Sequence, residues 1–298
     1  MKKHIFMAIL LFCLTTFAET AVPATSSPSP SSTPGDEITP VSMKGAETIS
    51  YREGTNAMNL FVYKPEGWKV ADRRPALVYF FGGGWTKGTP LKSASWGSWA
   101  AKQGMVGIVP DYRTKNRFGT SPLESVADGR AAFNWVVEHA SELGIDPAKI
   151  VVGGNSAGGH VALWTAITKT PPGSDSDEAP KVKPAGLFLS SAVTDTSTAT
   201  GYTPSRFGAN AQALSPVHHL DEKMPSVLMF HAEDDKLVKY STAVTLQKKL
   251  TASGNVCDLI TAPQGGHNFS SEVPEWKTKV RKQFEQFLKN EQLLPVVP

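Results

Sequence analysis

The sequence is poor in cysteine and in unbalanced charge, and both shortages exclude classes of protein. It holds two cysteines, and Cys13 lies in an N-terminal segment with leader character, so Cys257 alone remains in a mature chain and no internal disulfide can form. Lysine and arginine number 30 against 27 aspartates and glutamates, without the basic excess of a nucleic-acid-binding domain. We therefore expect a fold stabilised by its hydrophobic core and no nucleic-acid partner.

The N-terminal apolar run is too short for a permanent membrane span. The basic pair Lys2-Lys3 precedes the apolar run 5–14, and small residues follow up to Ala18. This order is typical of a secretory signal peptide, here residues 1–18. We expect a secreted or periplasmic protein with no membrane span in its mature form. Lipid attachment at Cys13 is not expected, because bulky residues precede it.

The remaining chain predicts one folded domain. Residues 19–44 include a stretch rich in proline, serine and threonine, which favours a disordered tether. Residues 45–292 carry the apolar content, and 293–298 form a short tail. A length of 298 residues with 40% hydrophobic and 19% charged residues suits a single larger domain.

Strand patterns alternate with helix patterns along this domain. Strands are expected at 47–51, 59–63, 76–81, 105–109, 149–153, 186–190, 227–231 and 256–261. Helices are expected around Trp96 and Trp99, after Ser156, at 121–143 with Gly144 closing it, at 240–252 and at 275–292. The first two strands predict an antiparallel edge hairpin, and the alternation predicts a mostly parallel sheet with helices on both faces.

The segment 149–164 combines a β-branched strand, four glycines and a helix around Ser156. A serine between a strand end and a helix start is held in a strained, exposed turn, which closes only if Gly154 and Gly158 lack side chains. The amide of Ala157 lies at the helix N-terminus, where unpaired N–H groups favour a developing negative charge. The segment therefore predicts a nucleophilic serine beside a donor for an oxyanion.

From residue 45 to about 290 the chain resembles an α/β-hydrolase of the esterase/lipase type. It is similar to the hormone-sensitive-lipase-like and bacterial acetyl-xylan-esterase-like groups. The matching pieces are Phe81-Gly82-Gly83-Gly84-Trp85, Asp111-Tyr112-Arg113, the Ser156 turn, the run 231–238 and Gly265-Gly266-His267. The resemblance implies an α/β-hydrolase fold with about eight strands and a minimal cap.

The serine needs a histidine base, and seven histidines are present. His267 is preferred because it follows the last expected strand, in the order Ser, Asp, His that this fold requires. His160 is expected to pack within the helix after Ser156, and His231 to pair with backbone. His218, His219 and Asp221 could form a metal site, but their spacing matches no strong ligand pattern. No metal is therefore expected.

The third group should be a carboxylate after the strand that ends at His231, and Asp234 and Asp235 compete for the role. The family pattern selects Asp235. The resemblance also implies that the amides of Gly83 and Gly84 donate to the oxyanion together with Ala157. Phe81 stands where many relatives carry a histidine that supports this loop, which bears on the rigidity of the loop and not on the donors.

These residues predict a secreted serine carboxylesterase without a cofactor. Its partner would be an ester substrate, and analogy with relatives favours acetyl groups on a polysaccharide such as xylan. Feruloyl-type or general short-chain esterase activity is the alternative, and a non-catalytic glycan- or partner-binding protein is an alternative of another class. Trp85 and Asn155 are expected to contact substrate. Trp96 and Trp99 either add a surface for sugar rings or, as their helical spacing favours, face the core.

Overall fold

The computed structural model describes residues 38–54, 56–171 and 179–294. The predicted signal peptide, the predicted tether up to residue 37 and the tail 295–298 lie outside the described residues. Thr39 and Met43, in the described end of that tether, contact the domain: Thr39 Oγ1 accepts a hydrogen bond of 2.9 Å from Arg117, and Met43 is buried. The folded part therefore begins before the predicted boundary at residue 45.

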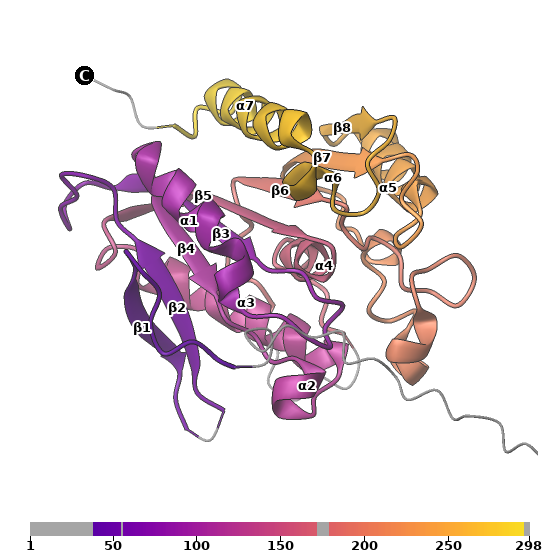
Figure 1. Cartoon of the computed structure of the whole chain (residues 1–298), viewed down its shortest axis with the longest axis horizontal. Coiled ribbons are helices and arrows are strands. Elements are labelled where there is room, and N and C mark those ends of the chain that lie inside the picture. Colours follow the sequence, from indigo (N-terminus) through magenta and orange to yellow (C-terminus); the bar gives the residue numbers. More distant parts are fainter. Residues whose placement is uncertain (1–37, 55, 172–178, 295–298) are drawn as a thin grey trace, which may run out of the picture. The chain divides into compact units, whose positions relative to one another are not determined.

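One sheet of eight strands, among the described residues, organises the domain (Figure 1). Its order is β1-β2-β4-β3-β5-β6-β7-β8, and the strands are β1 (Glu47–Arg52), β2 (Met58–Tyr63), β3 (Arg74–Phe80), β4 (Val106–Pro110), β5 (Ile145–Asn155), β6 (Gly186–Ser190), β7 (Ser226–Ala232) and β8 (Cys257–Ala262). Strand β2 pairs antiparallel with β1 and β4, and all other pairs are parallel. The predicted edge hairpin and the mostly parallel sheet are confirmed.

Helices cover both faces of the sheet. They are α1 (Ala94–Lys102), α2 (Lys115–Phe118), α3 (Pro122–Glu138), α4 (Ala157–Trp164), α5 (Tyr240–Ala252), α6 (Phe269–Glu272) and α7 (Pro274–Asn290), with short 3-10 turns at Pro90–Ser93, Pro204–Arg206, Gly208–Asn210 and Pro216–His218. None of the helices in the described ranges is long and apolar enough to cross a membrane.

Alternation along β3 shows why the sheet needs two helical layers. Val78 and Phe80 belong to the core that α3, α4 and α5 cover, whereas Leu77 and Tyr79 belong to the core that α1 and α7 cover. Successive side chains of a strand point to opposite faces, so a strand that is apolar throughout must be covered twice. The apolar run 76–81 is continuous because both of its faces are covered by helices.

Helix α3 starts where the sequence predicts and ends earlier. Ser121 and Glu124 form a capping box at its start, with Pro122 in the first turn. The helix ends at Glu138, so the prediction that it runs to residue 143 is wrong. Residues after His139 wind as turns, and the Ile145 amide bonds to the Ala140 carbonyl at 2.8 Å. That turn brings the chain into β5, and Gly144 closes the turn in the left-handed region.

Candidate active site

Ser156 lies in a sharp turn between β5 and α4. Its backbone has φ 53° and ψ −122°, a region that residues with a side chain rarely adopt. A Cβ on Gly154 would lie 2.4 Å from backbone atoms of Gly158, and one on Gly158 would lie 2.3 Å from the Phe80 carbonyl oxygen. Glycine is therefore required at both positions, as the sequence predicts, and the turn holds the serine at the end of a central strand.

His267 and Asp235 complete a line of hydrogen-bonded groups with Ser156. His267 Nε2 lies 2.9 Å from Ser156 Oγ, and His267 Nδ1 lies 2.8 Å from Asp235 Oδ2. A carboxylate only accepts hydrogen bonds, so Nδ1 carries the proton and Nε2 is the acceptor for the serine hydroxyl. The structure brings together three groups that are 79 and 32 positions apart in the sequence.

The Asp235 carboxylate is buried and is held by several donors. Its Oδ1 accepts from the amides of Leu237 and Val238 at 2.8 and 2.9 Å. Burial alone would raise the pKa of this carboxyl, yet hydrogen bonds from His231, His267 and the Val238 amide hold its pKa well below the usual range. Asp235 is therefore an anion at neutral pH and favours a positive charge on His267.

His231 supports this carboxylate, a role that the sequence did not reveal. Its Nε2 lies 2.9 Å from the Val238 carbonyl oxygen, which confirms the expected backbone pairing, and 3.2 Å from Asp235 Oδ2. Because a carbonyl oxygen only accepts, Nε2 carries the proton and also faces the carboxylate. The imidazole belongs to β7 and is fully buried. It therefore helps to hold the Asp235 carboxylate in place.

Asp234, the competing aspartate, holds the loop that carries the base. Its carboxylate oxygens accept from the amides of Gly265 and Gly266 at 3.1 and 2.8 Å. These two hydrogen bonds lower the pKa of Asp234. The two neighbouring aspartates thus have different partners. Asp235 binds the His267 imidazole, and Asp234 binds the backbone amides before His267.

The glycine loop after β3 approaches the serine turn closely. Gly83 has φ 149°, and a Cβ there would lie 1.8 Å from the Lys87 carbonyl oxygen, so only glycine fits. A Cβ on Gly82 would lie 2.7 Å from Asn155 Nδ2. The loop therefore packs against the residue before Ser156.

Known proteins resemble the chain in both sequence and structure. A family model described as BD-FAE matches residues 60–203. Esterase 2 of Thermogutta terrifontis, solved after phosphoramylation by tabun, superposes with a TM-score of 0.78 at 33% identity, over 86% of this chain and 98% of that one. The chain belongs to the α/β-hydrolase esterases. The same Thermogutta enzyme with butyrate bound gives a TM-score of 0.77 at 31% identity, over 86% of this chain and 97% of that chain.

The curated relatives match a shorter region of this esterase. Carboxylesterase NlhH of Mycobacterium tuberculosis is 35% identical over 125 residues, which cover 40% of this chain and 36% of NlhH. "Probable carboxylic ester hydrolase LipM" of the same species is 34% identical over 125 residues, which cover 42% of this chain and 28% of LipM. The chain thus spans about a third of the length of the curated relatives that it matches.

A cavity of about 650 Å³ opens beside Ser156 and His267 in this esterase. Asn155 lines it, where the sequence predicted a substrate contact, and so do Gly83 and Gly84. Tyr202 and Arg206 enter it from the connection between β6 and β7, and Leu237, which is 52% exposed, enters it from the loop after Asp235. No motif marked Tyr202 or Arg206, because only the folded connection between β6 and β7 brings them to the serine.

Trp85, where a substrate contact was expected, is buried. Its side chain is 1% exposed and packs edge-on against His160 and Phe207, with ring centroids 5.0 and 4.8 Å apart. It does not line the cavity at Ser156 but lines a smaller hollow beside that cavity, so its contact with substrate stays a prediction. Its backbone lies in the left-handed region, with φ 59°.

The two tryptophans of α1 differ from each other. Trp99 is buried in the core, as its helical spacing favours. Trp96 is half-buried, stacks on Tyr79 with centroids 5.1 Å apart, and also lines the cavity. The core position is therefore confirmed for Trp99. Trp96 packs against the same core as well as lining the cavity, and a surface for sugar rings stays a prediction.

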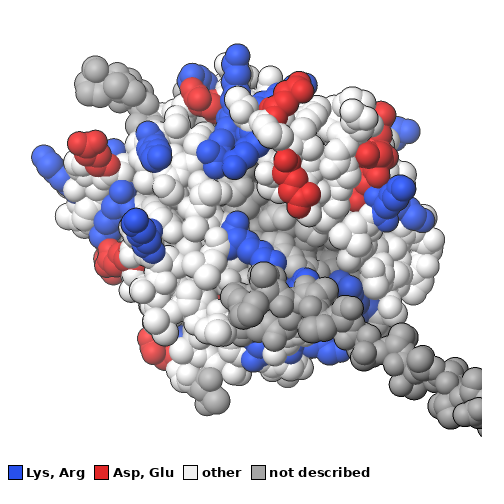
Figure 2. All heavy atoms as spheres, in the orientation of Figure 1, with Lys and Arg blue, Asp and Glu red and all other residues white. Residues whose placement is uncertain are grey.

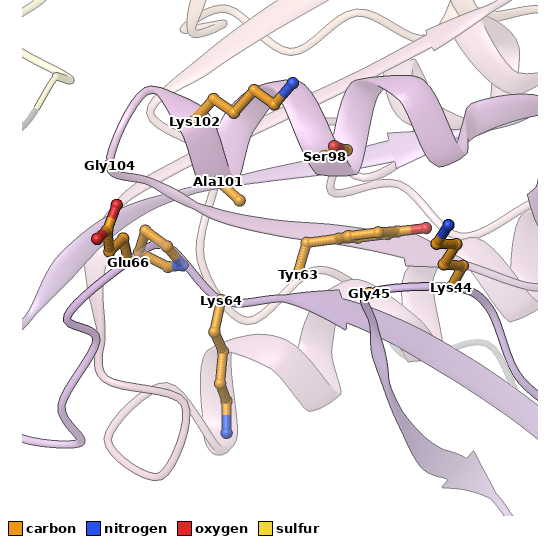
Figure 3. Close-up of a pocket in the computed structure, with 10 residues that line it drawn as sticks. Lys44, Gly45, Tyr63, Lys64, Glu66, Ser98, Ala101, Lys102 and Gly104 are labelled. Carbon is orange, nitrogen blue, oxygen red and sulfur yellow. The ribbon is translucent and has the colours of Figure 1, made fainter.

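A second cavity of about 480 Å³ lies between α1 and the end of β2 (Figure 3). Tyr63 crosses it between Lys44 on one side and Glu66 on the other, and Ser98 faces it from α1. No histidine is among its lining residues. No hydrogen bond joins a nucleophile to a base among its lining residues, in contrast to Ser156 and His267 at the larger cavity.

The remaining candidate histidines have structural partners. His160 is fully buried, and its Nε2 lies 2.7 Å from the Leu214 carbonyl oxygen; burial lowers its pKa to about 4, so it is neutral at pH 7. His218 Nδ1 lies 2.8 Å from Ser215 Oγ, and Asp221 pairs with Lys183 at 2.8 Å. His218 and Asp221 thus each have a different partner.

Proposed function

We propose that this protein is a secreted serine carboxylesterase that removes short acyl groups, with acetyl groups on a polysaccharide such as xylan as its substrate. The observation that carries the proposal is the line from Ser156 Oγ through His267 to Asp235, at 2.9 and 2.8 Å. This geometry suits a nucleophile, a general base and a group that stabilises the protonated base.

Acylation begins with the attack of Ser156 Oγ on the ester carbonyl carbon. His267 Nε2 takes the hydroxyl proton, and the anionic Asp235 stabilises the imidazolium. The tetrahedral intermediate then collapses, and His267 returns the proton to the leaving alcohol. Water attacks the acyl-enzyme with His267 as the base again, which releases the acid and restores the serine.

The oxyanion of each intermediate would bind the amides of Gly83, Gly84 and Ala157. Within the described ranges these three amides have no protein acceptor, and Ala157 is the first residue of α4, where N–H groups lack helical partners. Each such donor is typically worth about 3 kcal/mol of transition-state stabilisation. The lack of a protein acceptor supports the assignment of these amides as donors to the oxyanion.

The substrate assignment is supported by the shape of the site and by the relatives. The connection between β6 and β7 contains only short 3-10 turns, so the cavity stays open to a bulky alcohol. Structures of the Thermogutta esterase hold butyrate and propionate, which are short acids. The predicted signal peptide agrees with a substrate outside the cell.

The test uses protein from residue 19 onward with p-nitrophenyl acetate, acetylated xylan, a feruloyl ester and a long-chain ester. We expect hydrolysis of the acetate ester, release of acetate from xylan, and a loss of kcat on the order of a millionfold in Ser156→Ala. Higher activity on the feruloyl ester would favour that alternative. Folded protein that binds xylan but hydrolyses no ester would contradict the proposal and favour a binding protein.

A further inference from the structure

Two smaller hollows adjoin the cavity at Ser156. A hollow of about 400 Å³ shares Gly84, Thr86 and Arg206 with the cavity. Another, of about 140 Å³, shares Tyr202 and Leu237 with it. Because each hollow has lining residues in common with the cavity, both lie next to it, and we call the cavity and the two hollows together the groove.

The groove gathers far more positive charge than the chain as a whole. Its basic side chains are Lys87, Lys92, Lys115, Arg206, Lys236 and Lys239, and Glu272 is its one acidic side chain. Over the entire sequence the basic excess is only three. Figure 2 shows a hollowed area of the surface with lysine and arginine side chains along part of its border and acidic side chains along another part. Charges of one sign around a hollow reinforce each other's field and attract ligands of opposite sign.

The contacts of Arg206 and of the three lysines in the two side hollows leave their charge available to a ligand. Arg206 uses Nη1 for its hydrogen bonds to the Gly84 carbonyl at 3.2 Å and to the Tyr202 hydroxyl at 3.3 Å. Its Nε and Nη2 remain to bind two oxygens of one anionic group. No carboxylate among the described residues pairs with Arg206 or with the three lysines of the side hollows, and Glu272 is itself engaged by Asn268 at 2.8 Å.

We propose that this groove binds an anionic glycan, whose carboxylate- or sulfate-bearing sugars lie in the two hollows beside the ester that Ser156 cleaves. The proposal rests on the proposed esterase function and adds the charge of its substrate. An acyl group is small, so the cavity at Ser156 suffices for it. The basic side chains of the two hollows instead meet the polymer that carries the ester, and both hollows favour negative charge.

Matched polymers test the proposal. We would acetylate dextran, carboxymethyl-dextran and dextran sulfate to the same degree and measure acetate release. At about 0.01 M salt we expect kcat/KM on an anionic polymer to exceed that on dextran by about tenfold. The advantage should shrink at about 0.15 M salt, where the Debye length falls from about 30 Å to about 8 Å. The preferred polymer identifies carboxylate or sulfate as the anionic group. Equal values on all three polymers would overturn the proposal.

Charge-removing variants locate the effect. The variant Lys115→Gln/Lys236→Gln/Lys239→Gln should lower the ratio of kcat/KM between anionic and neutral polymer about fivefold. The control Lys69→Gln/Lys277→Gln/Lys282→Gln removes the same charge from exposed sites outside the groove and should leave that ratio unchanged. Equal effects of the two variants would show general attraction to a basic protein and contradict a groove.

Failure of the groove and failure of the esterase function are separable. Hydrolysis of p-nitrophenyl acetate reports the esterase function alone. Affinity electrophoresis of Ser156→Ala through gels that contain carboxymethyl-dextran or dextran sulfate reports the groove without catalysis. Retardation that the groove variant loses and the control variant keeps supports the proposal, and equal mobility of all variants in both gels contradicts it.

Discussion

The Tyr112 hydroxyl donates a hydrogen bond of 2.6 Å to the Phe81 carbonyl oxygen, and the two rings stack with centroids 4.0 Å apart. Both side chains are fully buried. Phe81 comes directly before the glycine loop, at the position where relatives were expected to carry a supporting histidine. In this chain the support comes from Tyr112, which lies two residues after the end of β4 and holds the carbonyl group directly before the loop.

Tyr112→Phe should therefore lower kcat more than it raises KM. The change keeps the ring and leaves the buried Phe81 carbonyl without its donor, which costs about 1–3 kcal/mol of stability. A matched control is Tyr51→Phe, because the Tyr51 hydroxyl donates to the Asp111 carbonyl at 2.7 Å, away from the loop. Steady-state kinetics and urea unfolding of both variants check this. Equal kcat values for the two would contradict a role for Tyr112 in positioning the loop.

Gly83→Ala should abolish most activity, because its Cβ would lie 1.8 Å from a backbone oxygen and the loop must move. With an oxyanion donor displaced, we expect kcat to fall about a hundredfold or more. Gly254→Ala is the control: it has a positive φ of 76° but nothing within 4 Å of an added Cβ, so only backbone strain of about 1 kcal/mol is expected. If both variants kept wild-type kcat, the loop would not bind the transition state.

The lowered pKa of Asp235 predicts how stability depends on pH. The folded state holds this carboxyl ionised more strongly than the unfolded state, where its pKa is about 3.9. Its contribution is present above pH ~4 and is lost as the pH falls through the folded-state pKa. Urea unfolding from pH 7 to pH 3 should show a loss of stability that is smaller in Asp235→Asn. An identical pH dependence in the variant would show that this carboxylate is not held as described.

Cys257 should be unreactive in the folded protein. Its side chain is buried at the start of β8, and burial, with a smaller effect of Asp258, raises the pKa of the thiol to about 12. At pH 8 almost no thiolate is present. Dithionitrobenzoate should release no colour from the native protein over minutes and should react with one thiol per mature chain in guanidinium chloride. Rapid reaction of the native protein would contradict the burial of β8.

The chemistry-bearing segments could be predicted from the sequence because each is local. The strand-to-helix turn at Ser156 and the loop before His267 are each determined by a short run of consecutive residues. Parallel strands then bring such loops to one edge of the sheet. The sequence could not assign the buried side chain of Trp85, whose ring packs against Phe207 from a distant segment. It also could not show Arg206 at the cavity or Tyr112 beneath the loop, since both contacts join segments that are far apart in the chain.

The central claim is that Ser156 is the nucleophile, and covalent labelling tests it most directly. Paraoxon should transfer one diethyl phosphate group per chain, tryptic mass spectrometry should place it on Ser156, and hydrolysis of p-nitrophenyl acetate should be lost in proportion to labelling. Ser156→Ala should take up no label. Inactivation with the label on another residue, or full labelling with undiminished activity, would contradict the account.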